Sequence, residues 1–385
     1  MRVLFVISEL TFGGAQKQVV ELSRQLVRHG HDVAIYTLND DVPRAEELDG
    51  SGVELFVDQK GMRLDPAVLK RLRATIRSWG ADIVHGFLFD GDIYARIAAV
   101  RTGIPVLNSE RNDNYTISRV QKIAHRLTKP LVDGVVANSR SGGAFAQELY
   151  GYSPEQVHVV WNGLHIDEFE KRSESTADFK REFFGPGEHK VACLVGAIKP
   201  AKDHPLALDV AKELVELDPA WRVLFVGDKL ATKVDYRVGK DSDSSDHKAM
   251  VMAHYERIGH HDRIEFAGAR KDVPAIVRQC DVLFITSRWE GFPNVVLEAM
   301  ALGTPVVSTE YSDIRYILPR PQLIVESRSP RELAQAIVAA QADRDAIAAE
   351  QRSWVRAHAS IETVTRELES VYARYVRRGG SARAV

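Results

Sequence analysis

The sequence predicts an α/β protein made of two doubly wound domains with a cleft between them, and three observations lead to this prediction. Short apolar runs rich in β-branched residues alternate with amphipathic segments along most of the 385 residues. Near-continuous apolar strands separated by helices are typical of parallel sheets that are covered on both faces. The strand-like runs also form two series, and the polar stretch 170–190 between them indicates a domain junction.

The first series of strands predicts a domain over residues 1–168. Its first helix signal is clear, because Val19, Leu22 and Leu26 share one helical face and Gly30 follows as a C-terminal stop. The predicted strands of this domain are 2–8, 32–38, 53–58, 81–87, 105–110, 134–139 and 157–163.

The second series predicts a domain over residues 169–359. One polar insert, 231–250, is interpreted as a surface loop. It contains Asp241-Ser242-Asp243, which matches a metal-binding DxD motif, but the serine- and aspartate-rich context with no preceding strand favours a solvated loop. The predicted strands of this domain are 190–198, 221–228, 263–268, 281–287, 304–309 and 322–327.

Composition and charge exclude several functional classes. The net charge of −2 gives no basic field that would favour nucleic acid. The two cysteines, Cys193 and Cys280, lie in apolar runs and are interpreted as buried thiols of a reducing compartment. No apolar stretch reaches the length of a transmembrane helix, and the first ten residues do not form a signal peptide. We therefore expect a cytoplasmic protein.

Two turns are candidates for phosphate binding. The first is Thr11–Gly14, where Gly13 and Gly14 follow a strand and open a helix whose N-terminal amides suit an anion. A plain strand-to-helix turn explains it equally well. The second is 196–205, where Lys199 and Lys202 flank a turn and would stabilise a diphosphate by their charge. Taken alone, this segment is better explained as an exposed loop.

Two acids, Glu290 and Glu298, lie eight residues apart where a predicted strand gives way to a helix. Ligands of doubly wound sheets bind at the carboxyl ends of strands. The acids are too staggered to act as an acid–base pair on one glycosidic bond, but they suit two hydroxyl-bearing parts of one long ligand. Pro293 has no amide hydrogen, and the amides that can reach the space between the acids are those of Gly291, Phe292, Asn294 and Val295.

These motifs together resemble the retaining glycosyltransferases of family 4, which have the GT-B fold of two Rossmann-like domains. The match includes EGFPNVVLE, which is similar to the EX7E signature of that family. The other matching segments are FGGAQKQVVELSRQLVRHGHDVAIYT, DIVHGF at 82–87, WNGLHIDEF at 161–169, VGAIKPAKDHPLAL at 195–208 and EFAGARKDVPAIVRQCDVLFITSRWEGFPNVVLEAMALGTPVV at 265–307.

The resemblance implies a nucleotide-diphosphate sugar as donor, with a UDP-sugar favoured, and neither a cofactor nor a metal. It assigns Glu298 to the ribose hydroxyls and Glu290 to hydroxyls of the donor sugar. It also implies that Glu290, His85 and Lys202 are catalytic, although a histidine hydrogen-bonded at a strand end is the simpler interpretation of His85. The remaining donor-binding residues that it implies are Gly13, Gly14, Lys199, Arg270, Gly291, Phe292, Pro293, Asn294 and Val295.

The sequence departs from the family pattern at three places. Ala197 stands where the family often has arginine, and Tyr311-Ser312-Asp313 replaces a glycine pair. The middle-strand GDG is GDK, with Lys229. The resemblance also places the last helix, about 360–378, with the first domain, which is expected to bind the acceptor.

Acceptor binding is predicted in the polar loop 108–115, with Glu110, Arg111 and Asn112 as candidates. The next segment, 116–130, is basic and amphipathic. It suits the anionic inner face of a cell membrane, although an ordinary helix with a solvated basic face explains the same pattern.

The sequence therefore predicts a retaining, metal-independent hexosyltransferase that acts on a glycan or lipid-linked glycan, as in polysaccharide or cell-surface glycan synthesis. One alternative is a nucleotide-sugar 2-epimerase of the same fold. Another is a non-catalytic sugar-nucleotide-binding protein.

Overall fold

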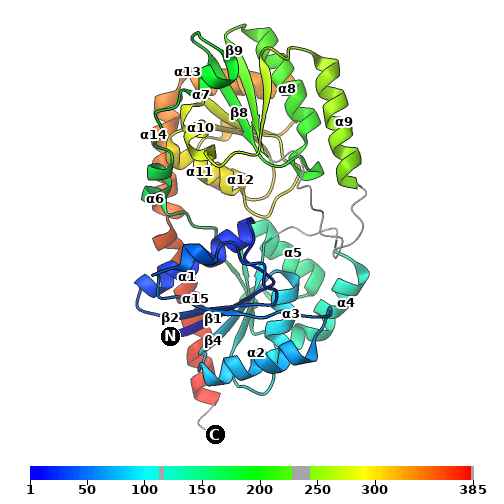
Figure 1. The fold of residues 1–385 in the computed structure, drawn as a ribbon, viewed down its shortest axis with the longest axis vertical. Helices are drawn as coiled ribbons and strands as arrows, with labels where there is room; N and C mark the ends of the chain where they lie inside the picture. Colours follow the sequence, from blue (N-terminus) through cyan, green and yellow to red (C-terminus); the bar gives the residue numbers. More distant parts are fainter. Residues whose placement is uncertain (112–116, 228–242, 383–385) are drawn as a thin grey trace. The chain divides into compact units, whose positions relative to one another are not determined.

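The computed structural model describes residues 1–111, 117–227 and 243–382 (Figure 1). The chain divides into two compact units. Unit 1 comprises Met1–His165 and Ala359–Val385, and unit 2 comprises Ile166–His358. Three sequence features lie outside the described residues: Asn112, Lys229, and Asp241 with Ser242 of the DxD motif.

Unit 1 is built on a seven-stranded parallel sheet with the order β3-β2-β1-β4-β5-β6-β7. Each strand predicted in the first series is present. The order reverses between β1 and β4, so the topological switch point of this sheet lies there. The strands are β1 (Arg2–Ile7), β2 (Asp32–Thr37), β3 (Glu54–Val57), β4 (Ile83–Phe87), β5 (Val106–Glu110), β6 (Gly134–Ala137) and β7 (Val157–Val159).

Alternate residues of β1 are buried against two different helix layers. Phe5 packs with α1 (Gly14–Arg28), whereas Leu4 packs with α2 (Pro66–Ser78) and α3 (Leu88–Ala98). Side chains of a strand alternate between the two faces of its sheet, so both faces of unit 1 are covered. Unit 1 also contains α4 (Arg119–Thr128), α5 (Arg140–Tyr150) and the 3₁₀ turns Ala45–Leu48, Lys129–Leu131 and Pro154–Gln156.

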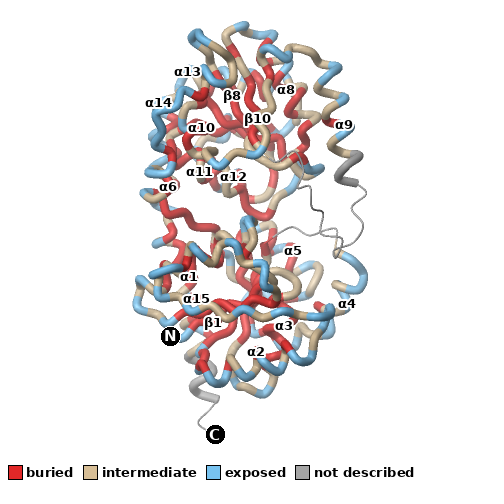
Figure 2. Tube along the Cα trace, viewed as in Figure 1, coloured by how far each residue is buried: buried red, intermediate tan, exposed pale blue. Residues whose placement is uncertain are grey.

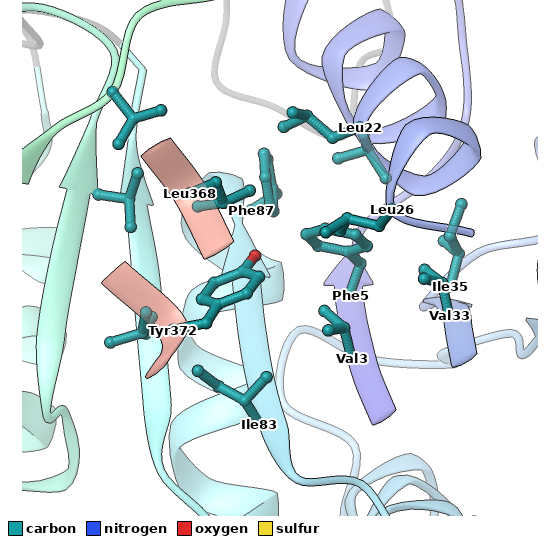
Figure 3. Close-up of a cluster of buried hydrophobic side chains, with 14 of the residues drawn as sticks. Val3, Phe5, Leu22, Leu26, Val33, Ile35, Ile83, Phe87, Leu368 and Tyr372 are labelled. Carbon is teal, nitrogen blue, oxygen red and sulfur yellow. The ribbon is translucent and has the colours of Figure 1, made fainter. Parts of the chain in front are cut away.

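The C-terminal helix α15 (Ile361–Ala382) belongs to the core of unit 1. Figure 3 shows Leu368 and Tyr372 of this helix beside Phe87 and Ile83 of β4, with Phe5 and α1 next to them. Since these side chains are almost completely buried, α15 completes the hydrophobic layer that α1 begins.

Unit 2 is built on a six-stranded parallel sheet with the order β10-β9-β8-β11-β12-β13. Each strand predicted in the second series is present, and the order reverses between β8 and β11. Figure 2 shows buried residues gathered in the strands of each unit and exposed residues on the outer helix faces. The strands are β8 (Lys190–Val195), β9 (Trp221–Val226), β10 (Ile264–Gly268), β11 (Val282–Ile285), β12 (Val306–Thr309) and β13 (Ile324–Val325).

The helices of unit 2 differ from the prediction at one place. The polar insert 231–250 was expected to be a loop throughout, but α9 begins at Asp243, so that prediction is wrong for its second part. The reason is that His247–Met250 continue into a helical segment whose tyrosine, Tyr255, packs on Phe266. The helices are α6 (Ile166–Arg172), α7 (Phe179–Phe184), α8 (His204–Leu217), α9 (Asp243–Ile258), α10 (Val273–Gln279), α11 (Asn294–Leu302), α12 (Ile314–Ile317), α13 (Pro330–Ala342) and α14 (Arg344–His358); Pro200–Lys202 and Pro321–Leu323 form 3₁₀ turns.

The two cysteines are buried free thiols, as the sequence predicted. Among the helices of the described residues, none is long and apolar enough to cross a membrane.

Candidate active site

The candidate site of unit 2 lies where the sheet order reverses. The loops that follow β8 and β11 leave the carboxyl ends of neighbouring strands, which is the place where ligands bind in doubly wound sheets. The loop after β8 carries Lys199 and Lys202, and the loop after β11 carries Glu290. The topology therefore brings together residues that are far apart in the sequence.

Lys202 and Glu290 form an ion pair across these two loops. The Lys202 Nζ atom lies 2.9 Å from both carboxylate oxygens of Glu290. The two side chains are only 19% and 15% exposed, so the pair is largely shielded from water. The Ser287 hydroxyl also donates to Glu290 Oε1. A carboxylate offers about four acceptor positions, which leaves room for a further donor such as a sugar hydroxyl.

The loops are also joined by hydrogen bonds that involve the main chain. The Arg288 amide donates to the Ala201 carbonyl at 2.8 Å, and the Thr286 hydroxyl donates to the Lys202 carbonyl at 2.8 Å. These bonds fix the register of one loop against the other. The bonds between the two loops therefore hold Lys202 and Glu290 close together, and the ion pair does not depend on the side chains alone.

Glu298 lies in the second turn of α11, as the sequence predicted, and is partly exposed. The helix begins at Asn294, so its N-terminal end and Glu290 adjoin the same loop. Gly291, Phe292 and Pro293 connect Glu290 to the helix. Of the predicted amides, that of Asn294 already donates to the Phe292 carbonyl at 3.1 Å. The positive end of the helix dipole nonetheless favours an anion here.

Tyr311 follows β12, and it is only 5% exposed. Burial, followed by the nearby Glu290 charge, raises the pKa of the Tyr311 hydroxyl well above its ordinary value. The neutral phenol therefore fills space beside Glu290 that a glycine would leave open.

Two other predicted donor-binding residues of unit 2 differ in their surroundings. Lys199 is exposed and precedes the 3₁₀ turn that ends at Lys202, so it is available to a ligand at this end of the sheet. Arg270 makes two hydrogen bonds to Asp272, at 2.9 and 2.7 Å, and one to Glu182 at 2.9 Å. Arg270 is not part of the Lys202–Glu290 group, because its guanidinium is bound by Asp272 and Glu182.

In unit 1, Gly13 and Gly14 lie at the start of α1, directly after the loop that leaves β1. Gly13 is the N-terminal cap, and no side chain caps this helix end. A Cβ atom at Gly13 would come within 2.2 Å of Gln16 Oε1. Gln16 Oε1 is the end of a flexible side chain that can move, and Gly13 has an extended backbone, so neither feature requires a glycine here. The first amides of α1 face an end without a side-chain cap, which suits an anion.

His85 lies in β4 and is completely buried. Its Nδ1 atom is 2.7 Å from the Tyr372 hydroxyl, and its Nε2 atom is 2.9 Å from the Ser109 hydroxyl. Burial, followed by the charge of Arg111, lowers the pKa of the imidazole well below its ordinary value. Both ring nitrogens are engaged within unit 1, so a direct role for His85 on a substrate would require one of these bonds to break.

The predicted acceptor residue Arg111 follows β5 and is buried. Its guanidinium donates to Asn162 Oδ1 at 2.7 Å and lies 4.7 Å from the centre of the Phe87 ring. Burial lowers the pKa of Arg111 to about 10 and raises that of the nearby Asp92 carboxyl to about 7. Glu110 ends β5 and is partly buried. These residues place a buried polar group at the carboxyl ends of the central strands.

Sequence reasoning missed two residues that contact the Glu290 loop, namely Asp203 and Arg328, and it named Ser312 only as a departure from the family pattern. Asp203 and Arg328 lie 125 residues apart and meet at 2.7 Å. No local pattern signals such a pair. The available signal was only the polar character of the loops at the carboxyl end of the sheet.

Comparison with protein families gives two matches that cover different parts of the chain. Residues 12–168 match the model described as Glycosyltransferase Family 4, and residues 189–343 match the model described as Glycosyl transferases group 1. The first match lies in unit 1 except for its last residues, and the second lies within unit 2.

Curated relatives match over most of their length. The D-inositol 3-phosphate glycosyltransferase of Geodermatophilus obscurus is 26% identical, over 94% of this chain and 84% of the relative. The mannosylfructose-phosphate synthase of Agrobacterium fabrum is 25% identical, over 77% of this chain and 71% of the relative.

Solved structures share the fold. HepE of Anabaena, in complex with UDP, has a TM-score of 0.81 and 19% sequence identity, and the match covers 97% of this chain and 100% of HepE. A glycosyltransferase from Rickettsia africae has a TM-score of 0.79 and 17% identity, over 97% of this chain and 98% of that one. The two parallel-sheet units are thus those of the GT-B fold. Together with this fold, the two family matches identify the chain as a glycosyltransferase of GT-B type, with a glycosyltransferase family 4 domain followed by a glycosyl transferases group 1 domain.

Proposed function

We propose that this protein is a retaining glycosyltransferase that moves a hexose-type sugar from a nucleotide-diphosphate sugar to a glycan or lipid-linked glycan acceptor. The observation that carries the proposal is the shielded Lys202–Glu290 pair at the switch point of unit 2, with Glu298 in the adjoining helix. This arrangement offers a cation for phosphate and two separate carboxylates for hydroxyls. We place the reaction in polysaccharide or cell-surface glycan synthesis.

The proposed roles follow from the charges of the groups. Lys202 and Lys199 stabilise the diphosphate leaving group, together with the N-terminal end of α11. Glu290 accepts hydrogen bonds from the donor sugar and Glu298 from the ribose. Because Lys199, Lys202 and the N-terminal end of α11 supply positive charge beside the proposed diphosphate position, we propose that the transfer needs no metal. A phosphate oxygen of the donor would then take the proton from the acceptor on the same face of the sugar, with retention.

A UDP-sugar is the favoured donor. HepE, which shares the fold, has been solved with UDP and with UDP-glucose. The similarity supports UDP and UDP-glucose as the first probes of this protein. The relatives named for D-inositol 3-phosphate and mannosylfructose phosphate support including phosphorylated polyols and sugars among the acceptors to be tested.

Helix α4 supports a contact with an anionic membrane surface, at the inner face of the cell membrane of a cytoplasmic enzyme. Its apolar residues Val120, Ile123 and Leu127 are 58%, 59% and 74% exposed. The side of α4 that faces the rest of unit 1 is polar. The buried Arg96 donates to Thr128 Oγ1 at 2.8 Å and contacts His125 Nδ1 at 3.2 Å. The exposed apolar row supports a membrane contact in preference to the alternative of an ordinary helix with a solvated basic face.

Charge decides which partner fits α4. Arg119, Lys122 and Arg126 are exposed beside the apolar row, and the helix sequence has no acidic residue. A surface helix with apolar and cationic side chains side by side is suited to lie in the headgroup region of an anionic bilayer. Such a contact would bring unit 1 to a lipid-linked acceptor.

A thermal-shift titration tests the donor site. UDP and UDP-glucose should raise the melting temperature of the wild type with concentration, because a ligand that binds only the folded state stabilises it. Glu298→Ala should abolish most of the shift. The matched control is Glu213→Ala in α8 of the same unit, which should leave the shift intact. A wild type that no nucleotide or nucleotide sugar stabilises would contradict the proposal.

Product analysis separates the alternatives. Nuclear magnetic resonance of the product should show the same anomeric configuration as the donor, and inversion would exclude the retaining mechanism. Conversion of the donor to a new sugar nucleotide without acceptor would instead identify a 2-epimerase. Donor binding without turnover over a broad acceptor panel would identify a non-catalytic binding protein.

A further inference from the structure

Several residues of the described chain other than glycine have a backbone in the left-handed region. This conformation is uncommon for side chains with a Cβ atom and persists only where the surrounding structure determines it. The residues are Leu88, Arg101, Asp203, His260, Ser312 and Arg328, with φ of 64°, 62°, 51°, 62°, 44° and 54°. Asp203, Ser312 and Arg328 have one feature in common. Each contacts the segment Thr286–Gly291, which carries Glu290.

Arg328 contacts the segment at two carbonyls. Its guanidinium donates to the carbonyls of Thr286 and Ser287, at 2.8 and 3.0 Å. It also donates to Asp203 Oδ2 at 2.7 Å. The side chain therefore clamps the carbonyls at the end of β11, immediately before the turn that places Glu290.

Asp203 contacts the same segment at two residues. Its Oδ2 atom accepts from Arg288 Nε at 2.7 Å, and its carbonyl accepts from the Thr286 hydroxyl at 3.2 Å. The Asp203 side chain is only 6% exposed, and the two arginines compensate its charge. Desolvation opposes ionisation of this carboxyl, but the bonds to Arg288 and Arg328 win, so its pKa is lowered.

Ser312 contacts the far end of the segment. Its hydroxyl donates to the Gly291 carbonyl at 2.7 Å, one residue after Glu290. Contacts thus reach the segment at Thr286, Ser287, Arg288 and Gly291, on both sides of the acid in the sequence. Each comes from a residue whose own backbone is strained.

We propose that Arg328, Asp203 and Ser312 are positioning residues that hold Thr286–Gly291, and with it the Glu290 carboxylate, in the geometry that binds the donor sugar. The inference rests on the proposed function for what Glu290 binds, but the clamp itself can be tested without a substrate. The left-handed backbone at these three residues is strained, and this strained conformation directs their contacts toward one loop. Glycine would relieve that strain and would lose the contacts.

The test uses Arg328→Gly and Arg328→Asn, since both residues tolerate a left-handed backbone. Amide hydrogen exchange is measured on the full-length protein, in peptides that cover residues 286–291. We expect exchange in this segment to accelerate by about tenfold or more, because local opening sets the rate. Exchange in the strands of unit 2 should stay unchanged. The melting temperature verifies that each variant is folded.

Arg101→Gly is the matched control. Arg101 has the same left-handed backbone, but it lies in unit 1, whereas the segment lies in unit 2. The same substitution there relieves strain and should leave exchange at 286–291 unchanged. Unchanged exchange in both Arg328 variants would overturn the proposal. Acceleration spread evenly over unit 2 would overturn it as well, because Arg328 would then only support overall stability.

Binding of UDP and UDP-glucose to the same variants separates this inference from the proposed function. If the segment loosens and UDP-glucose binds about tenfold more weakly while UDP binding changes less, both are supported, since Glu290 is assigned to the sugar and not to the nucleotide. If the segment loosens and both affinities stay at the wild-type values, the clamp is real but Glu290 does not bind the donor sugar. In that case the proposed site is wrong and the positioning of the loop stands.

Discussion

A carboxylate that is only 15% exposed, such as that of Glu290, is costly to bury unless a cation and hydrogen bonds compensate it. Lys202 and Ser287 supply that compensation in the structure. The same carboxylate must remain able to accept a sugar hydroxyl. The pair is therefore both a structural requirement of unit 2 and the centre of its proposed chemistry.

Breaking the pair from the cationic side should destabilise unit 2. Lys202→Met leaves Glu290 shielded and without its cation, which we expect to cost about 2 kcal/mol of the free energy of unfolding. The double variant with Glu290→Gln should lose less than the sum of the two single changes, because the amide needs no cation. Urea denaturation measures all three proteins, and strictly additive losses would show that the two side chains are not coupled.

Buried histidines predict how stability depends on pH. Burial, followed by the charge of Arg96, lowers the pKa of His125 to about 3. In the unfolded chain a histidine titrates near 6.5, so below that pH the unfolded state binds more protons and stability falls. Between pH 6.5 and 5 the loss from one such histidine is about 2 kcal/mol.

His125→Asn tests this dependence, since asparagine can accept from Arg96 and does not titrate. The variant should lose less stability than the wild type between pH 7 and 5, as measured by denaturation at both values. Asp92 has a raised pKa and acts in the opposite direction, but it is present in both proteins and cancels in the difference. Equal pH dependence in the two proteins would contradict the prediction.

At the scale of the element, the strands were predictable because each parallel strand is buried on both faces and its apolar run is nearly continuous. The orientation of α4 was not. Its sequence has an apolar row and a basic row at helical spacing. This pattern is the same whether the apolar row faces the core or the solvent, so it does not give the orientation of the helix. Contacts of Arg96 with Thr128 and His125 decide the outcome.

Vesicle binding tests the proposed surface role of α4. We expect the wild type to pellet with vesicles of anionic phosphatidylglycerol, less with neutral phosphatidylcholine, and less again at high salt, because each basic residue near the surface contributes about 1 kcal/mol. Ile123→Gln with Leu127→Gln should abolish most of the binding. Leu217→Gln, at another exposed leucine in unit 2, is the control and should bind like the wild type. Equal binding of all proteins would exclude α4 as the contact, and absence of binding by the wild type would exclude the contact itself.

At the scale of the whole molecule, unit 1 is completed by the last part of the chain. Ile361, Val364, Leu368 and Tyr372 are almost fully buried in its core, and Tyr372 also holds His85. Residues from the two ends of the sequence therefore fold as one unit, while unit 2 is continuous between them.

Removal of the residues after Ser360 should unfold unit 1. Each large apolar side chain that is lost contributes about 1.5–3 kcal/mol, so the total loss is on the order of 10 kcal/mol, comparable to the whole stability of a domain. Calorimetry should show that the transition of unit 1 disappears, whereas that of unit 2 persists. A truncated protein that retains both transitions would show that α15 is dispensable.

The sequence by itself determined the elements of both sheets, the start of α11 and the eight-residue spacing of Glu290 and Glu298, because these depend on local periodicity and turn residues. It also led to the glycosyltransferase assignment, which the two family matches bear out. The tertiary structure alone decided which side chains meet: Lys202 with Glu290, His85 with Tyr372, and Arg328 with Asp203 across 125 residues. Such contacts depend on strand order and loop register, and no local pattern in a sequence encodes the distance between two loops.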